Sequence, residues 1–263
     1  MAAPLAAFRQ IPLTYRLVMI VIVLTAAALL GGVLNALAGG GSLVTFPALL
    51  FAGLNPIDAN ASSVVALFPA TFASAWAYRR KIFDVAEVSV TGLSIVSLIG
   101  GVLGAVLLLS TPTSVFAGLV PWLVLFSTVV FAVGNFAPLD LIRRLALGPR
   151  GALAAHLVIS IYGGYFGGGI GLLMMAALTM TGLAVRNAGA AKNILAGVMN
   201  ASAVAIFAFS SDVHWLQADI TAVGASFGGW AGALMLKTVN ETLLKLGVVA
   251  IGLALTIGLF WKA

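Results

Sequence analysis

The feature that most constrains this chain is a series of long apolar runs that contain almost no charge. They lie at about 17–38, 57–78, 85–109, 114–136, 151–172, 187–209, 218–236 and 243–261. Each run holds ~19–25 residues, which is enough for a helix to cross the ~30 Å hydrocarbon core of a bilayer. The chain is 62% hydrophobic and 8% charged, far from the composition of a soluble domain. The sequence therefore predicts an all-α integral membrane protein with about eight long transmembrane helices.

Two further apolar pieces, 43–54 and 172–183, are too short to cross a bilayer, because each measures about 18 Å as a helix. A glycine triplet precedes each piece, at 39–41 and at 167–169. Non-helical backbone at membrane depth is tolerated only where protein or a water-filled cavity surrounds it. A helix that starts there exposes N–H groups with partial positive charge, which favour a bound anion. We interpret the triplets as two broken helices at a binding site; the alternative is that they only allow close helix packing.

The order of these parts is repeated along the chain. A shift of 129 residues places "GLNPIDANASSVVALFPATFAS" over "GLAVRNAGAAKNILAGVMNASA" and brings the two glycine clusters into register. Chance similarity between alanine- and glycine-rich helices is the alternative explanation. The repeat predicts a first half at 1–136, a basic linker loop at 137–150 and a second half at 151–263.

The charges between the apolar runs allow two topologies. Basic residues cluster at 79–81 and at 143–150, and both clusters are cytoplasmic if positive charge stays inside. If the short pieces are re-entrant, the halves form four plus four parallel spans; if they cross a thinned region, the halves form five plus five inverted spans. The ~18 Å length favours re-entrant pieces.

Polar residues follow each short piece. In the second turn, Lys192 lies inside a long apolar run, where a lysine costs about 3 kcal/mol or more and normally faces a cavity or a counter-charge. We expect it to attract an anion; snorkelling to the membrane surface is the alternative. Ser42 and Thr45 lie near the start of the first short helix and so near its cap. The predicted substrate-binding residues are Gly39, Gly40, Gly41, Ser42, Thr45, Asn60, Ser62, Ser63, Gly167, Gly168, Gly169, Lys192, Asn193 and Asn200.

Two titratable residues are candidates for coupling transport to a co-ion. His156 lies within an apolar run and titrates in the useful pH range, although a lone histidine there more often serves packing. Asp58 is the only acidic residue near the first turn, and capping the helix that starts at about Ala59 is its alternative role.

The segments "AGGGSLVTFPALLFAGLNPIDANASSVVALFPATFASAWAYRRK" and "GGYFGGGIGLLMMAALTMTGLAVRNAGAAKNILAGVMNASAVAIF" resemble the TauE/SafE sulfite exporter family, also called the TSUP family. The similarity covers nearly the whole chain. It implies a secondary transporter of small anions, chiefly sulfite, thiosulfate, sulfoacetate and other organosulfonates. Some relatives are assigned other small organic acids.

No motif for ATP hydrolysis or for a hydrolytic enzyme is present, so we predict neither an enzyme nor a cofactor. An anion channel and a non-transporting membrane scaffold are the competing functions. The expected location is the cell membrane, most simply the bacterial inner membrane, and no nucleic acid is expected as a partner. The expected partners are a small anion, the bilayer, a co-ion that is a proton or sodium, and a second copy of the chain in a homodimer.

Overall fold

The computed structural model describes residues 12–38, 40–78, 89–136, 147–235 and 241–262. These residues form ten α-helices and no strand. The helices are α2 Leu13–Ala38, α3 Ser42–Phe51, α4 Pro56–Tyr78, α5 Val90–Ser110, α6 Thr113–Phe136, α8 Pro149–Tyr165, α9 Ile170–Met180, α10 Val185–Phe207, α11 Trp215–Met235 and α12 Glu241–Lys262. The all-α prediction is therefore confirmed for the described part of the chain.

Four of the described helices are long and apolar enough to cross a membrane by length and composition. These spans are Leu17–Asn35, Val90–Ser110, Thr113–Gly134 and Asn187–Phe207. Their outward faces carry large apolar side chains, such as Leu103 and Trp122, whereas polar side chains such as Ser97 lie inside. A bilayer favours this distribution, because lipid tails are as apolar as leucine.

The fifth apolar run, expected at about 151–172, is interrupted at the glycine triplet, as the sequence predicted. The helix α8 ends at Tyr165, and α9 begins at Ile170 after the glycine triplet. Gly167 and Gly169 adopt positive φ angles of 80° and 71°, which a continuous right-handed helix does not allow. The short helix consequently begins and ends a few residues earlier than predicted.

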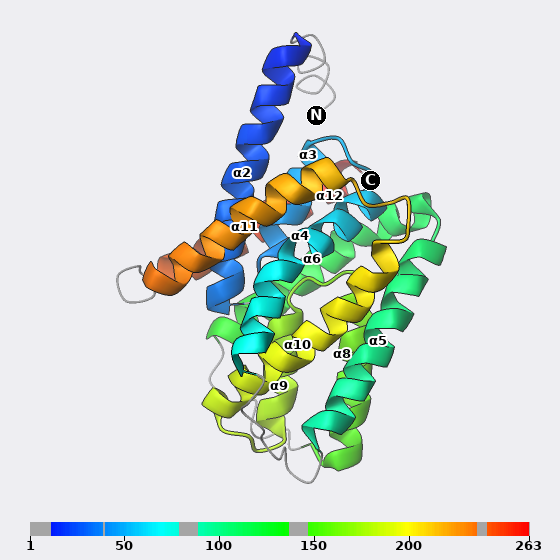
Figure 1. The fold of residues 1–263 in the computed structure, drawn as a ribbon, viewed down its shortest axis with the longest axis vertical. Coiled ribbons are helices and arrows are strands. Elements are labelled where there is room, and N and C mark those ends of the chain that lie inside the picture. The colour runs from blue at the N-terminus through cyan, green and yellow to red at the C-terminus, as the bar shows by residue number, and fades with distance from the viewer. Residues whose placement is uncertain (1–11, 39, 79–88, 137–146, 236–240, 263) are drawn as a thin grey trace.

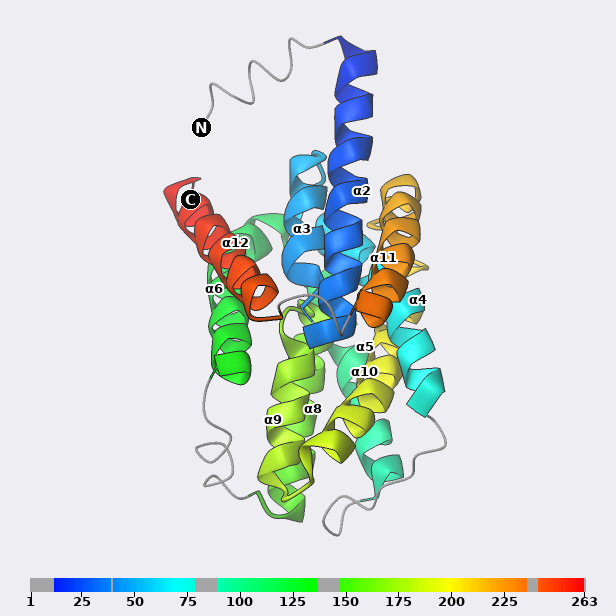
Figure 2. The ribbon, with the colours of Figure 1, turned by 90° about the vertical axis from the view of Figure 1, so that its left-hand side faces the viewer.

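The two short helices run in opposite directions from the middle of the molecule. In Figure 2, α2 and α3 form a hairpin whose tip lies at mid-height, with α3 running upward from it. The hairpin of α8 and α9 approaches from the other end, and α9 runs downward from the same level. A backbone hydrogen bond from Leu147 N–H to the Met180 carbonyl closes the open end of this second hairpin.

Corresponding helices end at corresponding positions. Phe51 ends α3 and Met180, 129 positions later, ends α9. The next glycine in each half, Gly53 or Gly182, has a positive φ angle of 97° or 87° and turns the chain into the following helix. The same local sequence therefore produces the same local backbone at both places.

Two helix pairs make very close contacts through glycine. On α5, a Cβ at Gly104 would lie 2.1 Å from the Ile161 carbonyl oxygen of α8. On α11, a Cβ at Gly228 would lie 2.1 Å from the Leu29 carbonyl oxygen of α2. Figure 1 shows α2 crossing α11 and α5 lying along α8. Small residues at such contacts let helix backbones approach each other in a membrane.

Candidate functional site

The first glycine break is buried where α2 turns into α3. A Cβ at Gly40 would lie 2.6 Å from the ring of Phe131 on α6, and one at Gly41 would lie 2.6 Å from the Gly31 carbonyl oxygen of α2. Gly39 lies outside the described residues. Gly41 is the N-cap residue of α3 and makes no side-chain capping hydrogen bond. This end of α3 therefore has room only for glycine.

The second glycine break lies beside the same helix. A Cβ at Gly168 would lie 2.4 Å from the hydroxyl oxygen of Ser127 on α6. Gly169 is the N-cap of α9, in the left-handed conformation and again without a side-chain cap. Ser127 in turn hydrogen-bonds the hydroxyl of Tyr162 on α8 at 2.7 Å.

Both breaks thus contact α6 about one helical turn apart, since Ser127 and Phe131 are four residues apart. The rings of Phe46 on α3 and Phe166 beside the second break meet edge to face with centroids 5.4 Å apart. The tips of the two hairpins are therefore close together, as predicted from the paired triplets.

Some of the amide donors at the two helix starts are already used. The N–H groups of Leu43, Val44 and Thr45 donate to the carbonyls of Gly40 and Gly41. At the second break, the N–H groups of Leu172 and Leu173 donate to the Gly169 carbonyl.

Other donors at the helix starts remain available. Among the described residues, the N–H groups of Ile170 and Gly171 have no backbone acceptor. The start of α9 therefore presents amide donors to whatever occupies the space in front of it. At the start of α3, the residue one turn before Ser42 is Gly39, which lies outside the described residues.

The polar residues of α4 are buried and hold protein partners. The amide of Asn60 donates to the carbonyl of Tyr165, the last residue of α8, at 2.9 Å. The Ser63 hydroxyl lies 2.7 Å from the Thr45 hydroxyl of α3, and Thr45 also donates to the Gly41 carbonyl. These residues were predicted to bind substrate; in the structure their observed contacts fasten α4 to both hairpins.

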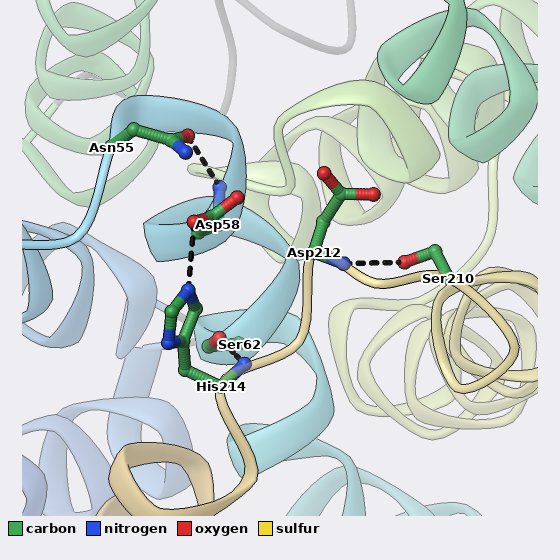
Figure 3. Close-up of polar contacts among 6 residues, drawn as sticks. All are labelled: Asn55, Asp58, Ser62, Ser210, Asp212 and His214. Carbon is green, nitrogen blue, oxygen red and sulfur yellow. Dashed lines mark hydrogen bonds and ion pairs between the residues drawn. The ribbon is translucent and has the colours of Figure 1, made fainter.

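Ser62 and Asp58 connect α4 to the loop before α11 (Figure 3). The Ser62 hydroxyl accepts a hydrogen bond from the backbone N–H of His214 at 3.0 Å. A carboxylate oxygen of Asp58 lies 2.8 Å from Nε2 of His214. Asn55, not Asp58, caps α4, because its side-chain oxygen accepts from the Asp58 N–H at 3.0 Å. The predicted capping role of Asp58 is therefore wrong, since the helix begins at Pro56, two residues earlier.

The polar residues of α10 differ from those of α4. Lys192, Asn193 and Asn200 are half-buried. Among the described residues, none of the three has a side-chain hydrogen bond or an ion-pair partner. Lys192 and Asn193 lie eight and seven residues before Asn200, about two helical turns, so each of them is near the face of α10 that carries Asn200. A half-buried ammonium group with no carboxylate partner leaves its charge available to an anion.

His156 on α8 is 1% exposed, and its Nε2 atom has no hydrogen-bond partner in the described part of the chain. The hydroxyl oxygens of Ser97 and Ser160 are in the same situation. Sequence analysis selected the histidine and missed the two serines. The spacing of four between His156 and Ser160, which places both on one helix face, was the available signal.

Residues 24–259 match the family model described as "Sulfite exporter TauE/SafE". The chain belongs to the TauE/SafE family. The match covers both glycine breaks and every helix from α3 to α11. It confirms the resemblance seen in the sequence and places the chain among membrane transporters rather than enzymes.

Named relatives of the TauE/SafE chain are similar along most of its length. A "Probable membrane transporter protein" of Haemophilus influenzae is 27% identical, covering 85% of this chain and 88% of its own. A "Probable membrane transporter protein ORF9" of a Sinorhizobium species is 28% identical, covering 89% of both chains. "Probable membrane transporter protein YfcA" of Escherichia coli K12 is 25% identical over 92% of this chain and 90% of its own. No solved structure matches the chain.

Proposed function

We propose that this protein is a secondary transporter that carries sulfite, sulfoacetate or another organosulfonate across the bacterial inner membrane by alternating access. The observation that carries the proposal is the convergence of two glycine-broken helix starts on one part of α6. Gly40 faces Phe131, and Gly168 faces Ser127. Paired broken helices in two halves of a transporter are typical of its central substrate site.

The chemistry of this region suits an oxyanion. A sulfonate group has three oxygens that accept hydrogen bonds, and the start of α9 offers the N–H groups of Ile170 and Gly171 at its positive end. In this proposal Lys192 supplies the positive charge, and it has no carboxylate partner among the described residues. The region thus has many donors and little negative charge, which disfavours a cation.

The helix arrangement supports two inverted halves. The short helices hold 10 and 11 residues, or about 15 and 16 Å, so each reaches roughly halfway across the hydrocarbon core. They run in opposite directions from the middle of the molecule (Figure 2). Parallel halves would send both in the same direction. We therefore propose that the tips of the two hairpins, where α2 turns into α3 and α8 turns into α9, lie near the midplane of the membrane.

Transport of radiolabelled sulfite, sulfoacetate and thiosulfate into proteoliposomes tests the function. A carrier gives saturable uptake of at least one anion, with competition among them. Flux that rises linearly with concentration would instead indicate a channel. If none of these anions nor a panel of small carboxylates moves faster than in empty liposomes, the proposal is wrong.

Lys192→Met tests the proposed charge. We expect the loss of anion binding while the protein is still inserted and folded, because the methionine side chain preserves most of the volume but removes the ammonium group. Arg150→Met is the matched control, since Arg150 is an exposed cation at the start of α8. Equal uptake by the two variants would show that Lys192 does not bind the anion and favour the alternative, in which its side chain snorkels to the membrane surface.

A further inference from the structure

Three buried polar atoms without protein partners lie on the contact between α5 and α8. Ser97 and Ser160 are completely buried, and His156 is 1% exposed. Neither serine hydroxyl, nor Nε2 of the histidine, makes a hydrogen bond to any described residue. Buried polar atoms in proteins are nearly always satisfied, so three unsatisfied ones on one helix contact need an explanation.

The packing of the two helices places these side chains at the same level. A Cβ at Gly100 would lie 2.4 Å from Cβ of Ser160, and a Cβ at Gly104 would lie 2.8 Å from Cα of Gly164. Because α5 and α8 advance together in this register, they are parallel. One turn earlier on each helix, Ser97 is level with His156.

The two serine hydroxyls can hydrogen-bond with either protonation state of an imidazole. A serine hydroxyl can donate to the lone pair of a neutral imidazole nitrogen, and it can rotate to accept from a protonated one. No carboxylate is needed for this exchange, and no backbone group has to move. Hydroxyls at the level of the imidazole on α5 and on the same face of α8 therefore suit a site whose ligand is a proton.

We propose that Ser97, His156 and Ser160 form a proton-binding site between α5 and α8, which couples movement of the anion to movement of a proton in the same direction. Nε2 of His156 takes a proton from water on one side of the membrane and returns it to water on the other. No covalent bond to the anion forms or breaks. The coupling rests on the proposed transport function, whereas the proton site itself does not.

The surroundings of His156 contain few other charges. Neither α5 nor α9 carries a charged residue, and α10 carries Lys192 and Arg186. On α8 itself, Arg150 is exposed at the start, and the hydroxyl of Tyr162 pairs with Ser127. A positive charge on His156 would therefore add to that of α10 and strengthen the attraction for an anion.

The path from the proton site to the anion site is short and continuous. The helix α8 ends at Tyr165, which is five residues or about 7.5 Å beyond Ser160, and Gly167 follows two residues later. The end of α8 carries the Tyr165 carbonyl that accepts from Asn60. A shift of α8 on protonation of His156 would therefore move the second glycine break directly.

The proton site can be tested without transport, because the chain contains only two histidines. Nitrogen NMR of histidine-labelled protein in lipid nanodiscs assigns His156 by comparison with His156→Gln. We expect its ring signals to titrate reversibly between about pH 4 and 8, and the midpoint to change in the double variant Ser97→Ala with Ser160→Ala. A His156 ring that keeps one protonation state over this range overturns the proposal.

The coupling is tested in proteoliposomes that contain a trapped pH dye. Adding thiosulfate or sulfoacetate outside should acidify the interior with the unmodified protein. The His156→Gln variant should acidify the interior at least ten-fold less than the unmodified protein does. It should still exchange labelled for unlabelled anion when the pH is equal on both sides. Ser110→Ala, at the exposed end of α5 where its hydroxyl donates to the Val106 carbonyl, is the matched control for the serine variants.

Two outcomes separate the proposals. Anion uptake by the unmodified protein without any proton movement would overturn the coupling and leave the transport function standing. Absence of uptake would refute the transport function, and the NMR titration would still decide whether the site binds a proton.

Discussion

Replacing Gly104 with alanine should destabilise the contact on which the α8–α9 hairpin depends. The added Cβ would lie 2.1 Å from the Ile161 carbonyl oxygen, 2.7 Å from the Tyr165 amide nitrogen and 2.8 Å from Cα of Gly164. All three neighbours are backbone atoms, so no side-chain rotation relieves the clash. The two helices must move apart instead.

The size of the effect follows from these distances. A normal contact needs more than 3 Å, so α5 and α8 must separate locally by about 1 Å, with loss of packing on both sides. Overpacking of this kind typically costs ~1–3 kcal/mol. At about 2–4 °C per kcal/mol for a chain of this size, we expect the melting temperature of Gly104→Ala to fall by roughly 2–12 °C.

Thermal unfolding in one detergent, followed by tryptophan fluorescence, measures this shift. Gly118→Ala on α6 is the matched control, because nothing lies within 4 Å of its added Cβ. That variant should be as stable as the unmodified protein or up to about 1 kcal/mol more stable, since alanine favours a helix interior over glycine.

Gly228→Ala repeats the experiment at the contact between α11 and α2, where the distance to the Leu29 carbonyl oxygen is also 2.1 Å. Both variants should have lower melting temperatures than the Gly118→Ala control. If Gly104→Ala melts at or above the control, α5 and α8 are not packed backbone to backbone, and the register that places Ser97 beside His156 is refuted.

Three further substitutions test the contacts around the candidate site. Ser63→Ala removes the buried hydrogen bond to Thr45 and should lower the free energy of unfolding by about 1 kcal/mol, measurable by thermal unfolding; no change would mean that the pair is not formed. Gly169→Ala forces a side chain into the left-handed region and should cost about 1–2 kcal/mol and reduce anion uptake, and full uptake would contradict the proposed role of the α9 start. Asp58→Asn breaks a partly exposed contact to His214, so the melting temperature should change by less than about 3 °C, and by still less in high salt. A large, salt-independent decrease would show that this contact contributes more to stability than a surface ion pair does.

Much of the candidate site was predictable because its signals are local. Glycine triplets ahead of short apolar pieces predicted the two hairpin tips, and both occur at α3 and α9. The segment "NPIDANASS" was expected to be a polar turn, but only Asn55 lies outside the helix, because α4 begins at Pro56. Capping depends on one or two residues of register, which composition does not specify.

The partners of the polar residues were not predictable in the same way. Asn60 and Lys192 both lie near the start of the long helix that follows a short helix. The amide of Asn60 nevertheless binds the Tyr165 carbonyl, 105 residues away, while Lys192 has no partner among the described residues. Sequence spacing shows which side chains share a face of one helix. It does not show which face of another helix they meet.

By itself, the sequence determined that this chain is helical and lies in a membrane, where its helices break, and to which family it is related. These properties depend on hydrophobicity and on backbone freedom within a few residues, so they can be read along the chain. Only the tertiary structure decided that the two short helices point away from a common middle, that Asn60 and Ser63 fasten hairpins together, and that Ser97 lies level with His156. Those outcomes depend on helix contacts between distant segments, where a missing Cβ at Gly100 or Gly104 sets how closely two backbones approach.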